Sequence, residues 1–349
     1  TGKTRIAGHL SLRQGLPAPS GGQARQEAMF VRPALQLDRH HQHPLLGRQQ
    51  ELESMRRILQ ATSSPSAAKH PHFLLLTGEA GIGKTRLAEE LSIEAYTQGW
   101  AVVWNRTNEQ KSQHEQQRLH VWDELLELLN ILCQVYPLLF ILDDLRADEE
   151  SIDLLGYLIH RLQEQRILLM ATCRDEELAQ AQKLHVLISE MQRKQALVTL
   201  PVQPLTAMEI GTLLGHLPGE IAQSTQAQAE GNPFFAQELA RLAEQNLSQT
   251  VHPLPETITA LFERRLHKLS RGCQVYLGET ALLGEAFELD QLLSSMQGYA
   301  EEDIFDLLEE ALHAKLLREE GTATHIIYRF CHPLFAAFLR ERRSASPHV

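Results

Sequence analysis

Residues 72–85 read HFLLLTGEAGIGKT, an apolar run that leads directly into a glycine-rich turn and a Lys-Thr pair. Gly78, Gly83, Lys84 and Thr85 fit the pattern G-x-x-x-x-G-K-[ST]. Phosphate oxygens must approach the backbone closely in such a loop, so a Cβ at either glycine would obstruct them. The stretch therefore predicts a strand, a phosphate-binding loop and a helix that begins at Lys84. The alternative, a glycine-rich turn without a ligand, does not explain why a strand precedes it and a helix follows.

The side chains of this loop have separate expected tasks. Lys84 is expected to reach the β- and γ-phosphates of ATP as a point charge, and the Thr85 hydroxyl is expected to ligate Mg²⁺. Successive backbone N–H groups are expected to point at the phosphates. The residues predicted to hold ATP or ADP in the loop are Gly78, Glu79, Ala80, Gly81, Ile82, Gly83, Lys84, Thr85 and Arg86.

Two consecutive acids follow the apolar run 138–142, LLFIL. A buried strand there would place Asp143 at its carboxyl end, where open α/β sheets bind ligands. We predict that Asp143 belongs to the Mg²⁺ shell, mostly through water. Asp144 is placed to polarise the water that attacks the γ-phosphate. A turn or helix-capping role for Asp144 is the alternative.

A further apolar run, LLMAT at 168–172, ends close to an arginine. Thr172 and Arg174 at the end of a strand are suited to sense the γ-phosphate. We predict Arg174 as a second catalytic residue beside Asp144. The alternative is a surface ion pair of Arg174 with one of the two acids that follow it.

The composition limits the class of protein. The chain has 349 residues, enough for two or three domains, and 43% of them are hydrophobic. With 33 basic against 44 acidic residues, the formal charge is -11, which argues against broad binding to nucleic acid or anionic lipid. The four cysteines form no paired motif, and no apolar run approaches the length of a membrane span. We expect a cytoplasmic protein without membrane association.

Strands and helices are expected to alternate up to residue 204. Apolar runs at 72–78, 100–104, 138–142, 166–172 and 195–202 are the predicted strands, separated by helical segments. This alternation predicts an α/β fold with a parallel sheet covered by helices on both faces. We assign residues 1–43 to a flexible extension and residues 44–204 to a P-loop nucleotide-binding domain.

The pattern changes after Pro204. Thr206 and Glu209 have the spacing of a capping box, so a helix is expected to begin there. Helices dominate from this point, and residues 316–330 are expected to form a hairpin with its turn near Gly321. We predict a helical lid over residues 205–254 and a winged-helix-like domain over residues 255–349.

Two features of the N-terminal segment suggest further sites only weakly. TGKTRIAGHL at 1–10 echoes the loop at 82–91 but lacks the first glycine and the strand. We interpret it as a remnant of a duplication or an arbitrary chain start. The histidine-rich tract at 38–44 has no Cys or carboxylate frame, so a solvated tract is favoured over a metal site.

In their order, the motifs resemble those of the signal-transducing ATPases with numerous domains, the STAND class of the AAA+ superfamily. The likeness is to the ATPase module of large LuxR-type and maltose-activator-type bacterial regulators, which is an origin-recognition-like AAA ATPase domain. It covers about residues 44–340. The matching stretches are PLLGRQQEL at 44–52, the loop at 78–85, LLFILDDLRADEES at 138–151, LLMATCRDEEL at 168–178, GNPFFAQEL at 231–239 and RFCHPLFAAFL at 329–339.

The resemblance implies further binding residues. Arg48 is similar to the residue beside the adenine, and Arg174 to the sensor arginine. Pro233 resembles the proline that packs near the base, and His332 the winged-helix histidine that contacts the β-phosphate of ADP. Each has a structural alternative: Asn232 and Pro233 also suit a helix start, and His332 also suits a cap of the last helix.

Three functions compete. The first is a nucleotide-dependent switch in a signalling or transcriptional regulator, with slow ATP hydrolysis and a protein partner or self-association in the ATP state. The second is an AAA+ motor or origin-recognition-like loader, which would need an arginine from a neighbouring subunit. A small-molecule kinase fits poorly, because the helical C-terminal part exceeds what such kinases need. Direct DNA binding by this chain is disfavoured by its charge.

Overall fold

The computed structural model describes residues 45–63, 72–106, 115–146, 148–162, 165–245, 254–296, 298–322 and 325–345. The strands are β1 (Phe73–Thr77), β2 (Ala101–Arg106), β3 (Leu138–Leu145), β4 (Ile167–Cys173), β5 (Leu197–Pro201), β6 (Ala286–Glu288), β7 (Leu317–Thr322) and β8 (His325–Phe330). The helices up to β5 are α1 (Gln49–Ser63), α2 (Lys84–Thr97), α3 (Glu115–Val135), α4 (Glu149–Arg161), α5 (Asp175–Gln180) and α6 (Gln182–Arg193). The later helices are α7 (Ala207–Leu213), α8 (Gly219–Ala229), α9 (Pro233–Gln245), α10 (Glu256–Leu266), α11 (Arg271–Thr280), α12 (Leu289–Ser295), α13 (Glu301–His313) and α14 (Pro333–Ala345).

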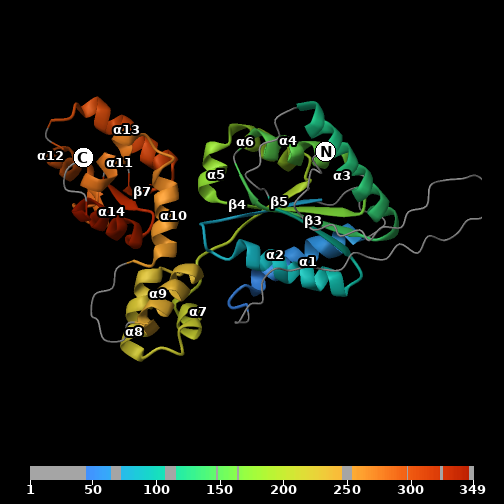
Figure 1. The fold of residues 1–349 in the computed structure, drawn as a ribbon, viewed down its shortest axis with the longest axis horizontal. Helices are drawn as coiled ribbons and strands as arrows, with labels where there is room; N and C mark the ends of the chain where they lie inside the picture. The colour runs from blue at the N-terminus through green and yellow to red at the C-terminus, as the bar shows by residue number, and fades with distance from the viewer. Residues whose placement is uncertain are drawn as a thin grey trace, which may run out of the picture.

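The first five strands form one parallel sheet in the order β2-β3-β4-β1-β5. Helices α1 and α2 cover one face, and α3, α4 and α6 cover the other (Figure 1). All five predicted strands are present, so the predicted α/β fold with a covered parallel sheet is confirmed. Because both faces are buried, the strands read as continuous apolar runs rather than as alternating patterns.

Successive residues of β1 supply two separate cores. Phe73 and Leu75 pack in the cluster with α3, α4 and α6, whereas Leu74 and Leu76 pack in the cluster with α1 and α2. All four side chains are fully buried. Successive side chains of a strand point to opposite faces, so one short run anchors both layers and fixes where the following loop emerges.

A bulge distorts β3 where its acids lie. Leu142 pairs with Ala171 and Leu145 pairs with Cys173, so two residues of β3 oppose a single residue of β4. Asp144, the second of those two, has a positive φ of 57°. Bulges of this kind re-aim side chains, and the left-handed backbone at Asp144 is a strained conformation that the surrounding contacts must hold.

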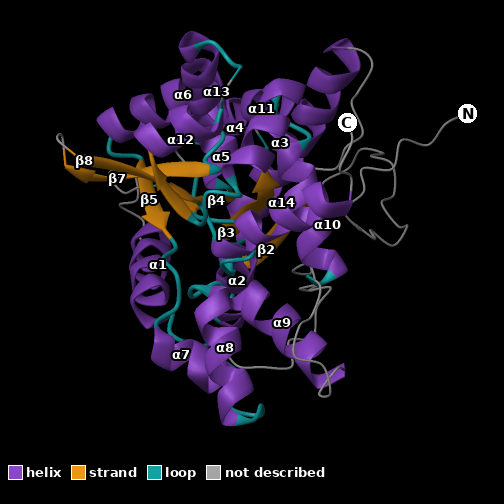
Figure 2. Ribbon diagram, turned by 90° about the vertical axis from the view of Figure 1, so that its left-hand side faces the viewer, coloured by secondary structure: helices purple, strands orange, loops and turns teal. Residues whose placement is uncertain are grey.

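The rest of the chain forms two units that share a single core. The three-helix unit, residues 205–245, contains α7 to α9, and the C-terminal unit, residues 254–345, contains α10 to α14 and an antiparallel sheet in the order β6-β8-β7. Their buried side chains belong to the same hydrophobic cluster. Figure 2 shows α7, α8 and α9 below the parallel sheet, away from α11 to α13.

Several local predictions after residue 204 are confirmed. Thr206 and Glu209 form a reciprocal capping box at the start of α7. The predicted hairpin is β7 and β8, which pair up to Thr322 and His325, just beyond Gly321. The echo at 1–10 and the histidine tract at 38–44 lie outside the described residues. Within the described ranges, no helix combines the length and apolar character that a membrane span requires.

Candidate nucleotide-binding site

The loop between β1 and α2 has the backbone that its glycines predict. Gly83 has φ +107°, and a Cβ built on it would meet no atom within 4 Å, so it borders open space. Gly81 has φ +83°, and a Cβ there would lie 2.7 Å from the Cβ of Phe234 on α9. One glycine therefore leaves room for a ligand, and the other allows the three-helix unit to approach the loop.

Lys84, the first residue of α2, folds back over this loop. Its Nζ donates hydrogen bonds to the carbonyl oxygens of Gly78 and Glu79, each at 2.9 Å. The side chain is buried, and burial lowers the pKa of Lys84, against the opposing effect of Glu176. The ammonium group is thus held at the loop without a direct carboxylate hydrogen bond, ready for an anionic ligand.

Asp143 joins the ends of three structural segments. The hydroxyls of Thr85 and Thr172 both donate to its Oδ1, at 2.9 Å and 2.8 Å. Thr85 belongs to α2, whereas Thr172 ends β4 next to β3. A carboxylate with a neighbouring hydroxyl is a set of hard oxygen ligands that suits Mg²⁺, as predicted for Asp143 and Thr85.

Asp144 and Arg174 are engaged with each other. Arg174 Nε donates to Asp144 Oδ1 at 2.9 Å, and an Nη donates to Oδ2 at 3.0 Å, which makes the pair bidentate. The backbone N–H of Asp144 donates to the Thr172 hydroxyl at 2.9 Å. The two predicted catalytic residues are therefore brought together, and the expected alternative partners of Arg174 on α5 do not take its guanidinium.

These groups border a cavity of about 1150 Å³ between the sheet and the three-helix unit. The predicted site residues that line it are Arg48, Ala80, Gly81, Ile82, Gly83, Lys84, Thr85, Arg86, Asp143, Asp144, Arg174 and Pro233. Gly78, Glu79 and His332 are predicted residues outside the lining. A cavity of this size, with convergent polar groups at one end, has the capacity for a nucleotide.

Arg48 holds a wall of the cavity. Its guanidinium donates to the carbonyl oxygens of Gln203 at 2.5 Å and Ile82 at 2.9 Å, and to Glu51 at 3.1 Å. The side chain is buried. Arg48 thereby ties the start of α1 to the phosphate loop and to the segment after β5, and its predicted place beside an adenine remains a prediction.

Asn232 and Pro233 form the entry to α9. Asn232 Oδ1 accepts from the N–H groups of Phe234 and Phe235, at 3.1 Å and 3.5 Å, while its Nδ2 donates to the Ala80 carbonyl at 3.0 Å. The helix-start interpretation is confirmed, because Pro233 is the first residue of α9. Proline suits this position, since the N–H that it lacks has no partner within the helix there. The same asparagine also anchors the three-helix unit to the phosphate loop.

His332 lies at the start of α14, where the capping alternative places it. Its Nδ1 accepts from the Leu334 N–H at 3.1 Å, so Nε2 carries the proton and donates to the Ala229 carbonyl at 3.2 Å. The ring packs edge-on against Phe235, with centroids 4.5 Å apart. Burial lowers the pKa of His332 to about 4. Both ring nitrogens are engaged, so in this arrangement no nitrogen of His332 is left for a phosphate.

No sequence motif indicated a row of side chains on α9 that faces the cavity. Gln237, Arg241 and Glu244 line it together with Pro233, at helical spacing. With Pro233 as the first helical residue, this spacing predicts that the side chains share one face of α9. Only the packing of α9 against the loop shows that this face points into the cavity. Glu89, one turn after Thr85 on α2, is a further lining residue that the motif did not indicate.

Comparison with known proteins finds a family match for part of the α/β unit. Residues 44–129 match the family model of the AAA ATPase domain. No curated protein matches the chain. Among solved structures it is similar to Cdc6p from Pyrobaculum aerophilum, at 14% identity over 84% of this chain and 94% of that chain, with a TM-score of 0.41. It is also similar to AMPPCP-bound DnaA from Aquifex aeolicus, at 13% identity over 77% of this chain and 89% of that chain, with a TM-score of 0.40.

Residues 44–129 are thus similar to the AAA ATPase domain, and the parallel sheet with its phosphate loop after β1 has the fold of a P-loop nucleotide-binding domain.

Proposed function

We propose that this chain is an ATP- and ADP-binding switch module of the STAND kind, with slow hydrolysis, within a signalling or transcriptional regulator. The ionic contact between Asp144 and Arg174 is the observation that carries the proposal. Binding groups are already assembled at the loop, whereas both groups that would act on the γ-phosphate and its attacking water hold each other. Such a site favours holding a nucleotide over hydrolysing it.

The residues of the loop fit a nucleoside triphosphate with Mg²⁺. The open space at Gly83 admits phosphate oxygens, Lys84 supplies a cation, and the Thr85 hydroxyl and Asp143 carboxylate supply hard oxygen ligands. A bound Mg²⁺ would neutralise charge on the β- and γ-phosphates. Lys84 would exchange its two carbonyl contacts for phosphate oxygens, which keeps the ammonium saturated in both states.

The apolar part of the cavity suits the base. Leu45, Leu46, Leu205, Leu213 and Leu261 line it at the side of the three-helix unit. Because these residues come from the start of the α/β unit, the three-helix unit and α10, a base between them would hold all three together. This arrangement gives a nucleotide the different contacts in two domain arrangements that a switch requires. We further propose that the ATP state exposes a surface for a protein partner or for self-association.

The test is a titration of ATP and ADP, with and without Mg²⁺, on the wild type and on Lys84→Ala. We expect the wild type to bind both nucleotides and Lys84→Ala to lose at least about 100-fold, because an ammonium that contacts two phosphates contributes about 3 kcal/mol or more. Lys183→Ala is the matched control, since Lys183 lies on the exposed side of α6 and pairs with Glu149. Equal losses in the two variants would refute the site.

Turnover against protein concentration separates the switch from an AAA+ motor or origin-recognition-like loader. The switch is expected to hydrolyse ATP at a low rate, on the order of 10⁻³ s⁻¹, that does not depend on concentration. A neighbour's arginine raises such rates by about 10³- to 10⁵-fold, so a steep rise on self-association would establish the loader instead.

A further inference from the structure

A buried arginine of the C-terminal unit lies behind the phosphate loop. Arg265 on α10 is only 7% exposed. Its Nη2 donates to the Lys315 carbonyl at 2.9 Å, and its Nη1 approaches Cys331 Sγ at 3.7 Å. Its Nε lies 4.0 Å from Glu176 Oε1, on α5 of the α/β unit. The guanidinium is thus fixed by its own unit while its charge faces the other unit.

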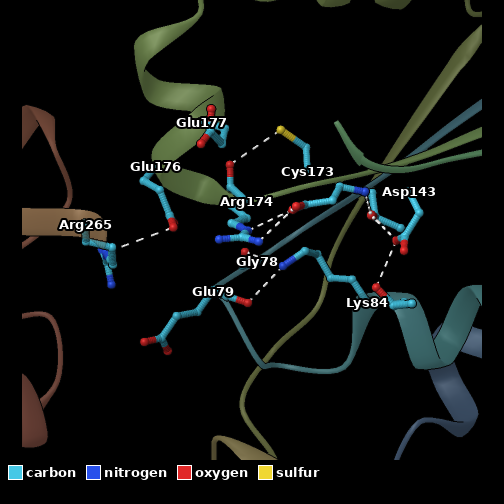
Figure 3. Close-up of polar contacts among 12 residues, drawn as sticks. Gly78, Glu79, Lys84, Asp143, Cys173, Arg174, Glu176, Glu177 and Arg265 are labelled. Atoms are coloured by element: carbon cyan, nitrogen blue, oxygen red, sulfur yellow. Dashed lines mark hydrogen bonds and ion pairs between the residues drawn. The ribbon is translucent and has the colours of Figure 1, made fainter. Parts of the chain in front are cut away.

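Two carboxylates of the α/β unit interact with the charge of this guanidinium, and Glu176 is the one that forms an ion pair with it. Glu176 is 5% exposed. Glu79, the second residue of the phosphate loop, directs its side chain away from Lys84 and toward Arg265, as Figure 3 shows. Its Oε1 is buried and accepts no hydrogen bond within the described structure. Burial raises the pKa of Glu79 to about 7, Arg265 acts to lower it and Glu176 acts to raise it.

These acids lie close enough to act on the phosphate-binding groups. Lys84 Nζ is bonded to the backbone of Glu79 itself, and the charges of Glu176 and Asp175 both act on Lys84. Unit charges about 10 Å apart in a partly buried site change a binding constant by roughly tenfold. Without Arg265, the uncompensated charge of Glu176 would therefore repel the phosphates of a bound nucleotide, and Glu79, whose pKa is about 7, would add to this to the extent that it is ionised.

We propose that Arg265 is a positioning residue of the nucleotide site: the C-terminal unit supplies it to neutralise Glu79 and Glu176 behind the phosphate loop. The inference rests on the proposed nucleotide binding and deepens it. Tight binding then depends on the C-terminal unit staying docked against α5. ATP carries one more negative charge than ADP, so ATP is the more sensitive of the two nucleotides.

The experiment compares the Kd of Mg·ATP and Mg·ADP for four proteins. Arg265→Met keeps the length of the side chain and removes its charge, and we expect about tenfold weaker ATP binding and a smaller loss for ADP. Adding Glu176→Gln to that variant should recover most of the loss, because Glu176 is the acid that pairs with Arg265. Lys268→Ala is the control, because Lys268 pairs at 2.5 Å with the neighbouring Glu177 and leaves the two buried acids untouched.

The rescue separates a charge effect from a packing effect, because removing a charge at Glu176 would not compensate for the loss of a merely structural arginine. Wild-type affinity in Arg265→Met, or no recovery in the double variant, overturns the proposal. If Arg265→Met does not fold, Glu176→Gln alone decides: with Arg265 still present, ATP binding should tighten several-fold relative to ADP, and an unchanged ratio overturns the proposal. A wild type that binds no nucleotide refutes the proposed function itself, whereas loss in Lys84→Ala with an unaffected Arg265→Met refutes only this inference.

Discussion

The phosphate loop and the corner where α9 and α14 begin use their motif residues in opposite ways. At the loop, the space beside Gly83 is open and Lys84 makes only contacts that a ligand can replace. At the corner, the side-chain polar atoms of Asn232 and His332 form hydrogen bonds with backbone groups of the protein. A motif that resembles a binding motif thus leaves open space and a cation for a ligand in one place, and holds the walls of the cavity together in the other.

The difference has an energetic consequence. Replacing a residue that faces the ligand is expected to change nucleotide affinity and to change the free energy of unfolding little, because the replacement leaves no buried polar group without a partner. A residue at the corner is expected to affect stability first, because a lost partner leaves a buried polar group unsatisfied. The following substitutions test this contrast, beginning with the largest expected effect.

Gly231→Ala should strongly destabilise the corner where α9 and α14 begin. Gly231 has φ +80°, and a Cβ there would lie 2.5 Å from the backbone oxygen of Leu205. Left-handed strain and the backbone clash together should lower the free energy of unfolding by about 4 kcal/mol in a denaturant titration.

The matched control for that change is Gly278→Ala on α11, where a Cβ would meet nothing within 4 Å. Alanine at this helical position should raise the free energy of unfolding by about 0.5–1 kcal/mol. Similar destabilisation of both variants would mean that the corner is not specially constrained.

His332→Asn should remove a pH dependence from the corner while keeping a cap for α14, because asparagine is a good N-cap. The pKa of His332 is about 4 in the folded chain, below its ordinary value of 6.5. The unfolded chain therefore binds more protons than the folded chain between these values, and stability falls as the pH falls from 6.5 toward 4. The total is about 3 kcal/mol.

The measurement is the difference in unfolding free energy between wild type and His332→Asn at several pH values. The contribution of Glu79 is present in both proteins and cancels. The wild type should lose its advantage as the pH falls through this window. A difference that stays constant would show that the buried histidine does not titrate as its surroundings indicate.

Asp144→Asn tests the same contrast at the nucleotide site rather than at the corner. The ion pair with Arg174 is partly exposed, so its loss should change stability by less than about 1 kcal/mol. ATP affinity should stay within about twofold, while single-turnover hydrolysis should slow by about tenfold or more, because an amide orients and polarises water less well than a carboxylate. Hydrolysis at the wild-type rate would make Asp144 a structural partner of Arg174.

Much of the fold followed from short stretches. The five strands, the helix start at Lys84 and the capping box at Thr206 each depend on residues within one or two turns, and all are present. The same holds for the phosphate loop, where glycines select the backbone that an L side chain disfavours. For His332, two roles were open, because its cap is local but its second partner is 103 residues away.

The sequence alone therefore determined the phosphate loop, the place of Asp143 on β3 and the parallel sheet, because backbone preference, strand burial and motif spacing act over a few residues. Tertiary structure decided which groups neutralise each other. Arg174 meets Asp144 across 30 residues, and Asn232 meets Ala80 across 152. In the sequence, Arg265 is an ordinary basic residue of a helix. Only the packing of α5 places Glu176 beside its guanidinium. Charge, burial and protonation depend on the distance between side chains in space, and only the packing of the units sets that distance.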